Sequence, residues 1–299
     1  MPQRKSISLY RKNLLPIQKN SGQQEYWLYS YSEFNRNGNQ IEQTVYTQDG
    51  SMVERTLKEY NAGGFVIREK YFAGEDEAAE EKSYDRNENG LILKEFKHYL
   101  DGSYDTTTYE YDSQNRILSR ITQNDEGETE QKTIHEYRDD FLVKSQVFDG
   151  DGNLLQSDEF KYDEKGNSVE HKRVDNETAE ESFIVTSYNS NGRKRREERF
   201  DEDGDLISQS VFDENGKGQL VKITETGSDK NITILFRYDE NGNAIEQEEL
   251  DEEGNQLVLV KRAYDEVNNL VHSEVFIDGQ GLTLPQHYEI KFEYEFHPE

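Results

Sequence analysis

Apolar and polar side chains alternate along many short stretches of this chain. In HYEIKFEYEFHPE (residues 287–299), Tyr288, Ile290 and Phe292 alternate with Glu and Lys. The stretch NITILFRYDE (231–240) follows the same period of two over most of its length. This period is typical of a β-strand that buries one of its faces, because successive side chains of a strand point to opposite sides.

A short phrase separates these stretches. It consists of an aromatic or apolar residue, Asp or Asn, two polar residues, and Gly or Asn, as in YDEKGN at Tyr162 and YDENGN at Tyr238. It recurs in two interleaved series with a period of about 25 residues, so that one half-unit spans about 12 to 13 residues. The residues that mark the repeat are Tyr111, Tyr162, Gly166, Tyr188, Phe200, Gly204, Phe212, Tyr238, Gly242, Leu250, Gly254 and Tyr264.

The phrase has the residues of a tight hairpin turn. Asp at the first turn position accepts hydrogen bonds from backbone amides, and Gly near the end adopts a positive φ without strain from a Cβ. A type I turn followed by a left-handed residue has these preferences. We therefore expect a positive φ at Gly166, Gly204, Gly242 and Gly254.

The acidic turns resemble calcium loops only superficially. An EF-hand loop needs oxygen ligands at alternate positions, Gly at the sixth position and Glu at the twelfth. In FDGDGN (148–153) and FDEDGD (200–205), Gly is instead the fourth residue counted from the first Asp, and no Glu is fixed at the twelfth. We expect turn chemistry alone, with no metal site and no cofactor.

The composition favours an ordered protein with a thin core. Of 299 residues, 63 are Asp or Glu and 35 are Lys or Arg, which gives a formal net charge of -28, and only 32% are hydrophobic. These values approach those of disordered chains. However, 19 Tyr and 14 Phe favour a pleated, half-buried surface.

These patterns predict an all-β chain of roughly twenty antiparallel strands built from consecutive hairpins. Helical periodicity is weak throughout. The best candidate is AGEDEAAEEKS (73–83), which holds either one helical turn or a long loop.

The phrase [YF]-D-x-x-G-[NDR], present at Tyr162, Phe212 and Tyr238, resembles the YD-repeat, or Rhs-like, family. The chain is also loosely similar to MORN-type and antitoxin-like hairpin repeats. The resemblance covers about residues 30 to 296. It implies a long sheet that curls into a shell or superhelical strip, which in large members encloses a toxin domain. With no toxin segment after the repeats, we expect here an open, partial shell.

Charge divides the chain into a basic arm (1–25) and a single hairpin-repeat domain (26–299). Arg4, Lys5 and Arg11 are among the basic residues that precede the first acidic one, Glu25. The arm is either a solvated terminus or a segment that docks on an acidic partner or a neighbouring subunit. No stretch approaches the ~18 apolar residues of a membrane span, and no signal peptide is recognisable, so we expect a cytoplasmic location.

No catalytic motif is found. The chain has no cysteine, and its six histidines form no metal-binding pattern. His135 follows the alternation of inward-facing residues and is expected to be a satisfied histidine of the sheet. The basic run 193–196 is expected to provide counter-charges within the sheet rather than a docking patch.

The function predicted from these features is non-enzymatic binding or scaffolding. So acidic a protein repels nucleic-acid phosphates and favours a basic protein partner. A toxin-neutralising immunity or antitoxin-like protein is one concrete form of this function. Glu246 and Glu248, which share one face of a strand, are the candidate partner surface. The alternative is a structural protein that self-associates through sheet edges or the arm.

Overall fold

The computed structural model describes residues 3–14, 25–74, 78–228, 231–279 and 283–298. These residues form 22 strands, and no helix occurs among them. The candidate helical stretch 73–83 contains the end of one strand and the start of the next, with no helical turn in its described part. Among the described residues no helix is long and apolar enough to cross a membrane.

The contacts divide the chain into two compact units, Met1–Glu81 with Ile232–Glu299, and Lys82–Asn231. The strands of the first unit are β1 (Arg4–Asn13), β2 (Trp27–Phe34), β3 (Gln40–Tyr46), β4 (Met52–Tyr60), β5 (Val66–Ala73), β18 (Ile232–Tyr238), β19 (Ala244–Leu250), β20 (Gln256–Tyr264), β21 (Leu270–Ile277) and β22 (Gln286–Phe296).

The strands of the second unit begin with β6, whose first two residues precede Lys82. They are β6 (Glu80–Arg86), β7 (Ile92–His98), β8 (Tyr104–Tyr111), β9 (Ile117–Gln123), β10 (Thr129–Arg138), β11 (Phe141–Asp149), β12 (Leu154–Tyr162), β13 (Ser168–Asp175), β14 (Glu180–Tyr188), β15 (Lys194–Phe200), β16 (Leu206–Glu214) and β17 (Leu220–Gly227).

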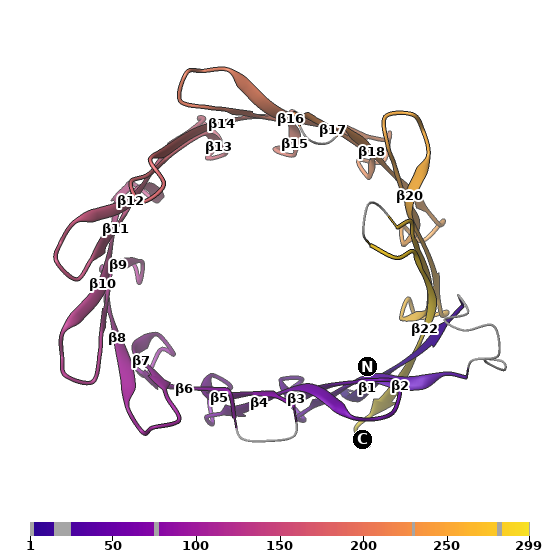
Figure 1. Cartoon of the computed structure of the whole chain (residues 1–299), viewed down its shortest axis with the longest axis horizontal. Coiled ribbons are helices and arrows are strands. Elements are labelled where there is room, and N and C mark those ends of the chain that lie inside the picture. The colour runs from indigo at the N-terminus through magenta and orange to yellow at the C-terminus, as the bar shows by residue number, and fades with distance from the viewer. Residues whose placement is uncertain (1–2, 15–24, 75–77, 229–230, 280–282, 299) are drawn as a thin grey trace. The chain divides into compact units, whose positions relative to one another are not determined.

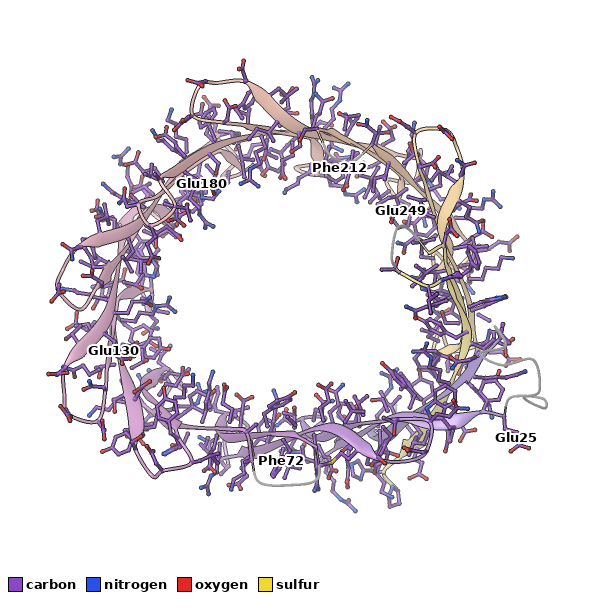
Figure 2. All side chains as sticks on the ribbon, viewed as in Figure 1. Glu25, Phe72, Glu130, Glu180, Phe212 and Glu249 are labelled. Atoms are coloured by element: carbon purple, nitrogen blue, oxygen red, sulfur yellow. The ribbon has the colours of Figure 1, made fainter. Side chains whose placement is uncertain are left out.

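In the second unit, each strand from β7 to β16 pairs antiparallel with the next along the chain. Lys172 of β13, for example, lies opposite Phe183 of β14, which lies opposite Phe200 of β15. The prediction of an all-β chain of consecutive antiparallel hairpins is confirmed. In each unit, side chains project from both faces of the ribbon (Figure 2).

The pairing of the first and last strands, in the first unit, differs from the predicted fold class. An open, curled or superhelical strip would leave the first and last strands of the chain as unpaired edges. Instead, β1 pairs antiparallel with β2 on one side and with β22 on the other. Figure 1 shows these strands together, close to both labelled chain ends. The expectation of an open, partial shell is therefore wrong at the ends of the chain.

The same pairing gives the basic arm a definite structure. Residues Arg4–Asn13 form β1 and are part of the sheet, with Ile7 opposite both Ser32 of β2 and Tyr294 of β22. Residues 4–13 therefore do not form the solvated extension that was considered for residues 1–25.

The turns have the predicted chemistry. At 163–167, the amide of Gly166 donates to the carbonyl of Asp163 (3.0 Å), and Asp163 Oδ1 accepts from the amides of Lys165 and Asn167 (both 2.9 Å). The strand pairing shifts by one residue immediately before the turn, as in a β-bulge. Gly166, Gly204, Gly242 and Gly254 have φ of 83°, 84°, 89° and 85°.

The sheet has almost no apolar core. Ile232, at 5% exposure, is the single buried hydrophobic residue in the described part of the chain. The other buried side chains are short and polar, with Thr44 and Thr133 each 2% exposed. Long neighbouring side chains cover them, since Arg, Lys, Tyr and Glu bury their stems while their polar ends stay in water.

Tyrosine hydroxyls link neighbouring strands across this thin sheet. Each donates to a backbone carbonyl about 20 residues earlier in the chain, on the neighbouring strand. The pairs are Tyr60 with Gln40 (2.7 Å), Tyr111 with Ile92 (2.8 Å), Tyr137 with Ile117 (3.0 Å), Tyr162 with Leu142 (2.7 Å), Tyr188 with Ser168 (2.7 Å), Tyr264 with Ala244 (3.2 Å) and Tyr294 with Leu270 (2.7 Å).

The positive φ of the turn glycines can be tested by substitutions at Gly204. A Cβ there would meet no atom within 4 Å, so only its φ of 84° opposes a side chain. Gly204→Val should lower the free energy of unfolding by about 1–2 kcal/mol. Gly204→Asn should cost less than half as much, because Asn115 and Asn268 occupy equivalent positions with φ of 64°. Urea denaturation tests this, and equal costs for Val and Asn would contradict it.

The contribution of the tyrosine hydrogen bonds to stability can be tested with two further variants. Tyr60→Phe removes the hydroxyl that donates to Gln40 and should lower the free energy of unfolding by about 1 kcal/mol. Tyr46→Phe is the control, because Tyr46 is also half-buried at a strand end but makes no hydrogen bond through its hydroxyl in the described structure. Equal effects in chemical denaturation would show that these contacts do not stabilise the sheet.

Candidate partner-binding surface

Successive turns of the second unit lie at opposite ends of its strands, because consecutive strands are antiparallel. One row, here called the acidic turn row, consists of residues 99–103, 124–128, 149–153, 175–179 and 201–205. The other, here called the mixed turn row, consists of residues 87–91, 112–116, 139–140, 163–167, 189–193 and 215–219.

The two rows differ strongly in charge. The acidic turn row contains 12 Asp and Glu and no Lys or Arg, whereas the mixed turn row contains six Asp and Glu and four Lys and Arg. The strand segments between them carry many opposite charges that pair with one another, such as Lys172 with Glu181 (2.5 Å). Unbalanced negative charge therefore gathers at one end of the strands.

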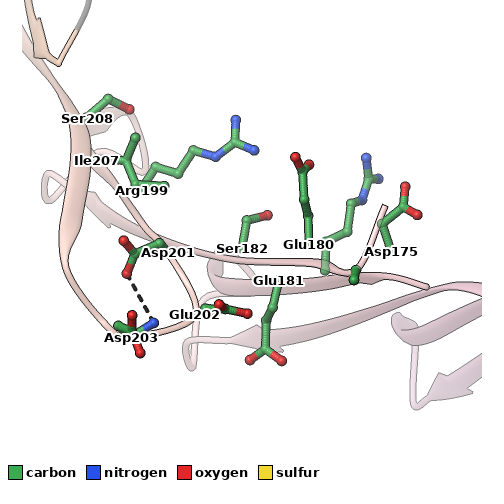
Figure 3. A pocket seen from close by; sticks show the side chains of 12 residues that line it. Asp175, Glu180, Glu181, Ser182, Arg199, Asp201, Glu202, Asp203, Ile207 and Ser208 are labelled. Carbon is green, nitrogen blue, oxygen red and sulfur yellow. Dashed lines mark hydrogen bonds between the residues drawn. The ribbon is translucent and has the colours of Figure 1, made fainter. Parts of the chain in front are cut away.

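A groove of about 630 Å³ lies between two neighbouring turns of the acidic row, 175–179 and 201–205. It forms because Ser182 and Ser208 are short side chains on the same face as the long side chains of Arg173 and Arg199. Figure 3 shows side chains that line the groove, with Glu180 and Arg199 pointing to the same side of the sheet.

The carboxylates around the groove have two different roles. Asp201 closes its own turn, since its Oδ1 accepts from the amides of Asp203 (3.1 Å) and Asp205 (2.8 Å). One of these bonds is drawn in Figure 3. The side chains of Glu202 and Asp203 are exposed and have no hydrogen-bond or ion-pair partner in the described structure. They are available to a ligand.

The groove also offers cationic and apolar contacts. Arg173 is held by Asp158 (2.7 Å), whereas Arg199 forms no ion pair within the described residues. Ile207 is 36% exposed at the groove, next to Leu206 at 51%. Ala179, in the adjoining turn, has φ of 57°, which is uncommon outside glycine. The surface can therefore contact positive, apolar and carbonyl or carboxylate groups of one ligand.

The most buried charged cluster lies beside this groove. Asp158, 5% exposed, accepts from His171 (2.7 Å), Arg173 (2.7 Å) and Gln156 (2.6 Å), and His171 stacks on Phe160. Burial raises the pKa of Asp158, but these hydrogen bonds outweigh it and the pKa is lowered. The cluster links β12 to β13 through the side chains of His171 and Arg173.

The residues proposed from sequence lie elsewhere. Glu246 and Glu248 are on β19 of the first unit, where Glu246 pairs with Arg237 (3.0 Å) and lies opposite Lys261. Part of that charge is already balanced. The repeat landmarks lie at strand ends beside the turns, where they shape the hairpins.

His135 is not fully satisfied. Its Nδ1 is buried without a hydrogen-bond partner, so the expectation of a satisfied sheet histidine is wrong for that atom. Burial, with a smaller contribution from the charge of Arg120, lowers the pKa of His135. The neutral ring avoids placing a second cation beside Arg120.

The basic run 193–196 provides counter-charges within the sheet, as expected. Three of its four side chains form ion pairs: Arg193 with Glu214 (3.3 Å), Lys194 with Glu197 (2.6 Å) and Arg196 with Glu198 (3.3 Å). Among the residues that the structure describes, no three His, Asp or Glu side chains are grouped so that they could hold a metal ion.

The acidic turn row was not predicted from the sequence. Counting charge over the whole chain conceals it, because the two kinds of turn alternate along the sequence. Summing the charge of every second turn would have revealed it, since antiparallel hairpins bring alternate turns to the same end.

Comparisons with known proteins show no family membership for this all-β protein. No family model matches the chain, and no curated protein matches it. Among solved structures, a porin-like protein from Bacteroides uniformis is similar over 98% of both chains, at 11% identity and a TM-score of 0.32. A TcdB2-TccC3-Cdc42 structure matches 93% of this chain and 21% of that chain, at 10% identity and a TM-score of 0.26. Likenesses this weak carry no argument about function.

The capping carboxylates predict a loss of stability in acid. Hydrogen bonds from the side chain and then the backbone of Asn153 lower the pKa of Asp149. A carboxyl whose pKa is lowered by folding stabilises the fold above its unfolded pKa of about 3.9, and this contribution is lost as the pH falls through the folded value. Asp149→Asn should keep the cap but remove this titration.

We therefore expect Asp149→Asn to lose less stability than the parent protein between about pH 4 and pH 2. Asp151→Asn is the control in the same turn, because the side chain of Asp151 has no partner in the described structure. The free energy of unfolding is measured against pH by urea denaturation. Identical pH profiles for the parent and Asp149→Asn would contradict the expectation.

Proposed function

We propose that this protein is a non-enzymatic binding protein whose acidic turn row binds a basic segment of another protein. The observation that carries the proposal is the charge of that row, 12 acidic and no basic residues along one end of the second unit. Opposite charge steers a partner during diffusion and increases the association rate.

The groove gives this surface a place for specific contacts. A Lys or Arg of the partner can lay its aliphatic stem on Ile207 and bring its charge to Glu202 or Asp203. Arg199 can donate hydrogen bonds to a carbonyl or carboxylate of the same segment. The partner class that fits is therefore a basic protein segment with at least one exposed acceptor, rather than a uniformly cationic polymer.

The resemblance to YD repeats refines this proposal. An immunity or antitoxin-like role in the cytoplasm would suit an acidic hairpin-repeat protein that binds a basic target. The alternative is self-association through sheet edges or the N-terminal arm. Its form that uses unpaired edges at the chain ends is disfavoured, because β1 pairs with both β2 and β22.

Charge reversal at the groove tests the proposal. The partner is first isolated from the source cells, and its dissociation constant is then measured for Glu202→Lys with Asp203→Lys. We expect this double variant to weaken binding about tenfold, which corresponds to about 1.4 kcal/mol. Binding to the parent protein should also weaken between about 50 and 500 mM salt, because exposed charges are screened over ~8–10 Å.

The matched control is Glu164→Lys with Glu88→Lys, which reverses two charges in the mixed turn row. Its net charge change equals that of the groove variant, so it separates a local site from a general effect of charge. Circular dichroism verifies that both variants stay folded. Equal weakening by the two variants, or binding that is indifferent to salt, would contradict the proposed surface.

A further inference from the structure

β1 lies between two strands from distant parts of the sequence. Its residues Arg4–Asn13 face β22 over their whole length and face β2 from Ser6 to Arg11. A strand that fills such a position contributes backbone hydrogen bonds on both sides, so the slot between β22 and β2 recognises an extended segment through its main chain.

Side chains make the slot selective for a basic strand. Carboxylates of β22 pair with lysines of β1, and tyrosines of β22 lie against its arginines. The contacts are Lys5 with Glu295 (3.2 Å), Lys12 with Glu289 (3.8 Å), Arg11 over the Tyr288 ring (3.9 Å to its centre) and Arg4 over the Tyr294 ring (5.1 Å). Each of these four cationic side chains of β1 thus meets either a carboxylate or the face of an aromatic ring on β22.

The link between β1 and β2 is unlike the other links around it. β1 ends at Asn13 and β2 begins at Trp27, whereas the strands that follow are joined by short turns such as 35–39 and 47–51. A short turn forces two strands of one copy to pair with each other. The long connection imposes no such restriction, and lengthening a loop adds only a small entropic cost.

We propose that β1 exchanges between copies of this protein, with the β1 of one copy filling the slot between β22 and β2 of another. The contacts of β1 are identical in the closed and exchanged forms, because both copies carry the same strand and the same slot. The two forms differ only in the path of the connection, and exchange of an identical element is a low-cost route to a dimer. This inference concerns the first unit and does not depend on the proposed partner surface.

A charge-swapped pair of full-length chains tests the exchange. The first chain carries Lys5→Glu and Lys12→Glu, and the second carries Glu289→Lys and Glu295→Lys. In each chain alone, β1 and its slot repel one another. In an exchanged heterodimer both strands meet a complementary slot, so mixing should produce a one-to-one dimer at least tenfold more abundant than any dimer of either chain alone. Light scattering coupled to size exclusion measures this.

A second measurement leaves the ion pairs of Lys5 with Glu295 and of Lys12 with Glu289 in place. Ser8 lies opposite Glu293 across β1 and β22, and the chain has no cysteine of its own. A Ser8→Cys chain and a separately tagged Glu293→Cys chain are mixed under mild oxidation. Exchange should give a mixed disulfide at least tenfold more abundant than with the control chain Ser190→Cys, whose cysteine lies in a turn of the second unit.

Either product supports strand exchange. The absence of a charge-swapped heterodimer together with a mixed disulfide no more abundant than the control would overturn it, and β1 would then be a fixed part of one copy. Loss of partner binding in the groove variants bears on a different unit, so failure of one proposal is distinguishable from failure of the other.

Discussion

The antiparallel backbone ladder is the interaction on which the rest of this structure depends. Ile232 is the single buried hydrophobic residue in the described part of the chain, and most other apolar strand residues bury only part of their surface, so no thick core holds the strands together. Each strand is instead held by its neighbours on both sides and by cross-strand pairs of long side chains. A sheet of this kind tolerates a highly polar sequence, provided that every strand has a partner.

That requirement explains the tyrosines and the chain ends. Tyrosine hydroxyls such as that of Tyr162 donate to backbone carbonyls of the neighbouring strand, which adds a link between the two strands. An unpaired first or last strand would expose a row of backbone N–H and C=O groups that have no hydrogen-bond partner in the sheet. In the first unit, β1 pairs with both β2 and β22 and so removes the two edges that the ends of the chain would otherwise leave.

Charge is placed according to the same geometry. On the strands, opposite charges pair between neighbouring strands, as Lys172 of β13 and Glu181 of β14 do diagonally, and partly cancel. The turns of the acidic row contain no Lys or Arg, and side chains such as Glu202 and Asp203 are exposed to solvent. Alternate turns of the second unit differ in composition, and the sheet brings the acidic ones to the same end of the strands. The candidate surface is thus a consequence of the hairpin repeat.

Sequence alone determined the strands, their antiparallel order and the conformation of turn residues such as Gly204, because these follow from local alternation and from the allowed φ of single residues. It also indicated that the positive charges of 193–196 would be balanced by acidic residues of the same sheet. Only the tertiary structure decided that β1 pairs with β22, since that contact joins the two ends of the sequence. The unsatisfied Nδ1 of His135 and the gathering of acidic turns likewise depend on neighbours that are distant in sequence, and local patterns carry no information about them.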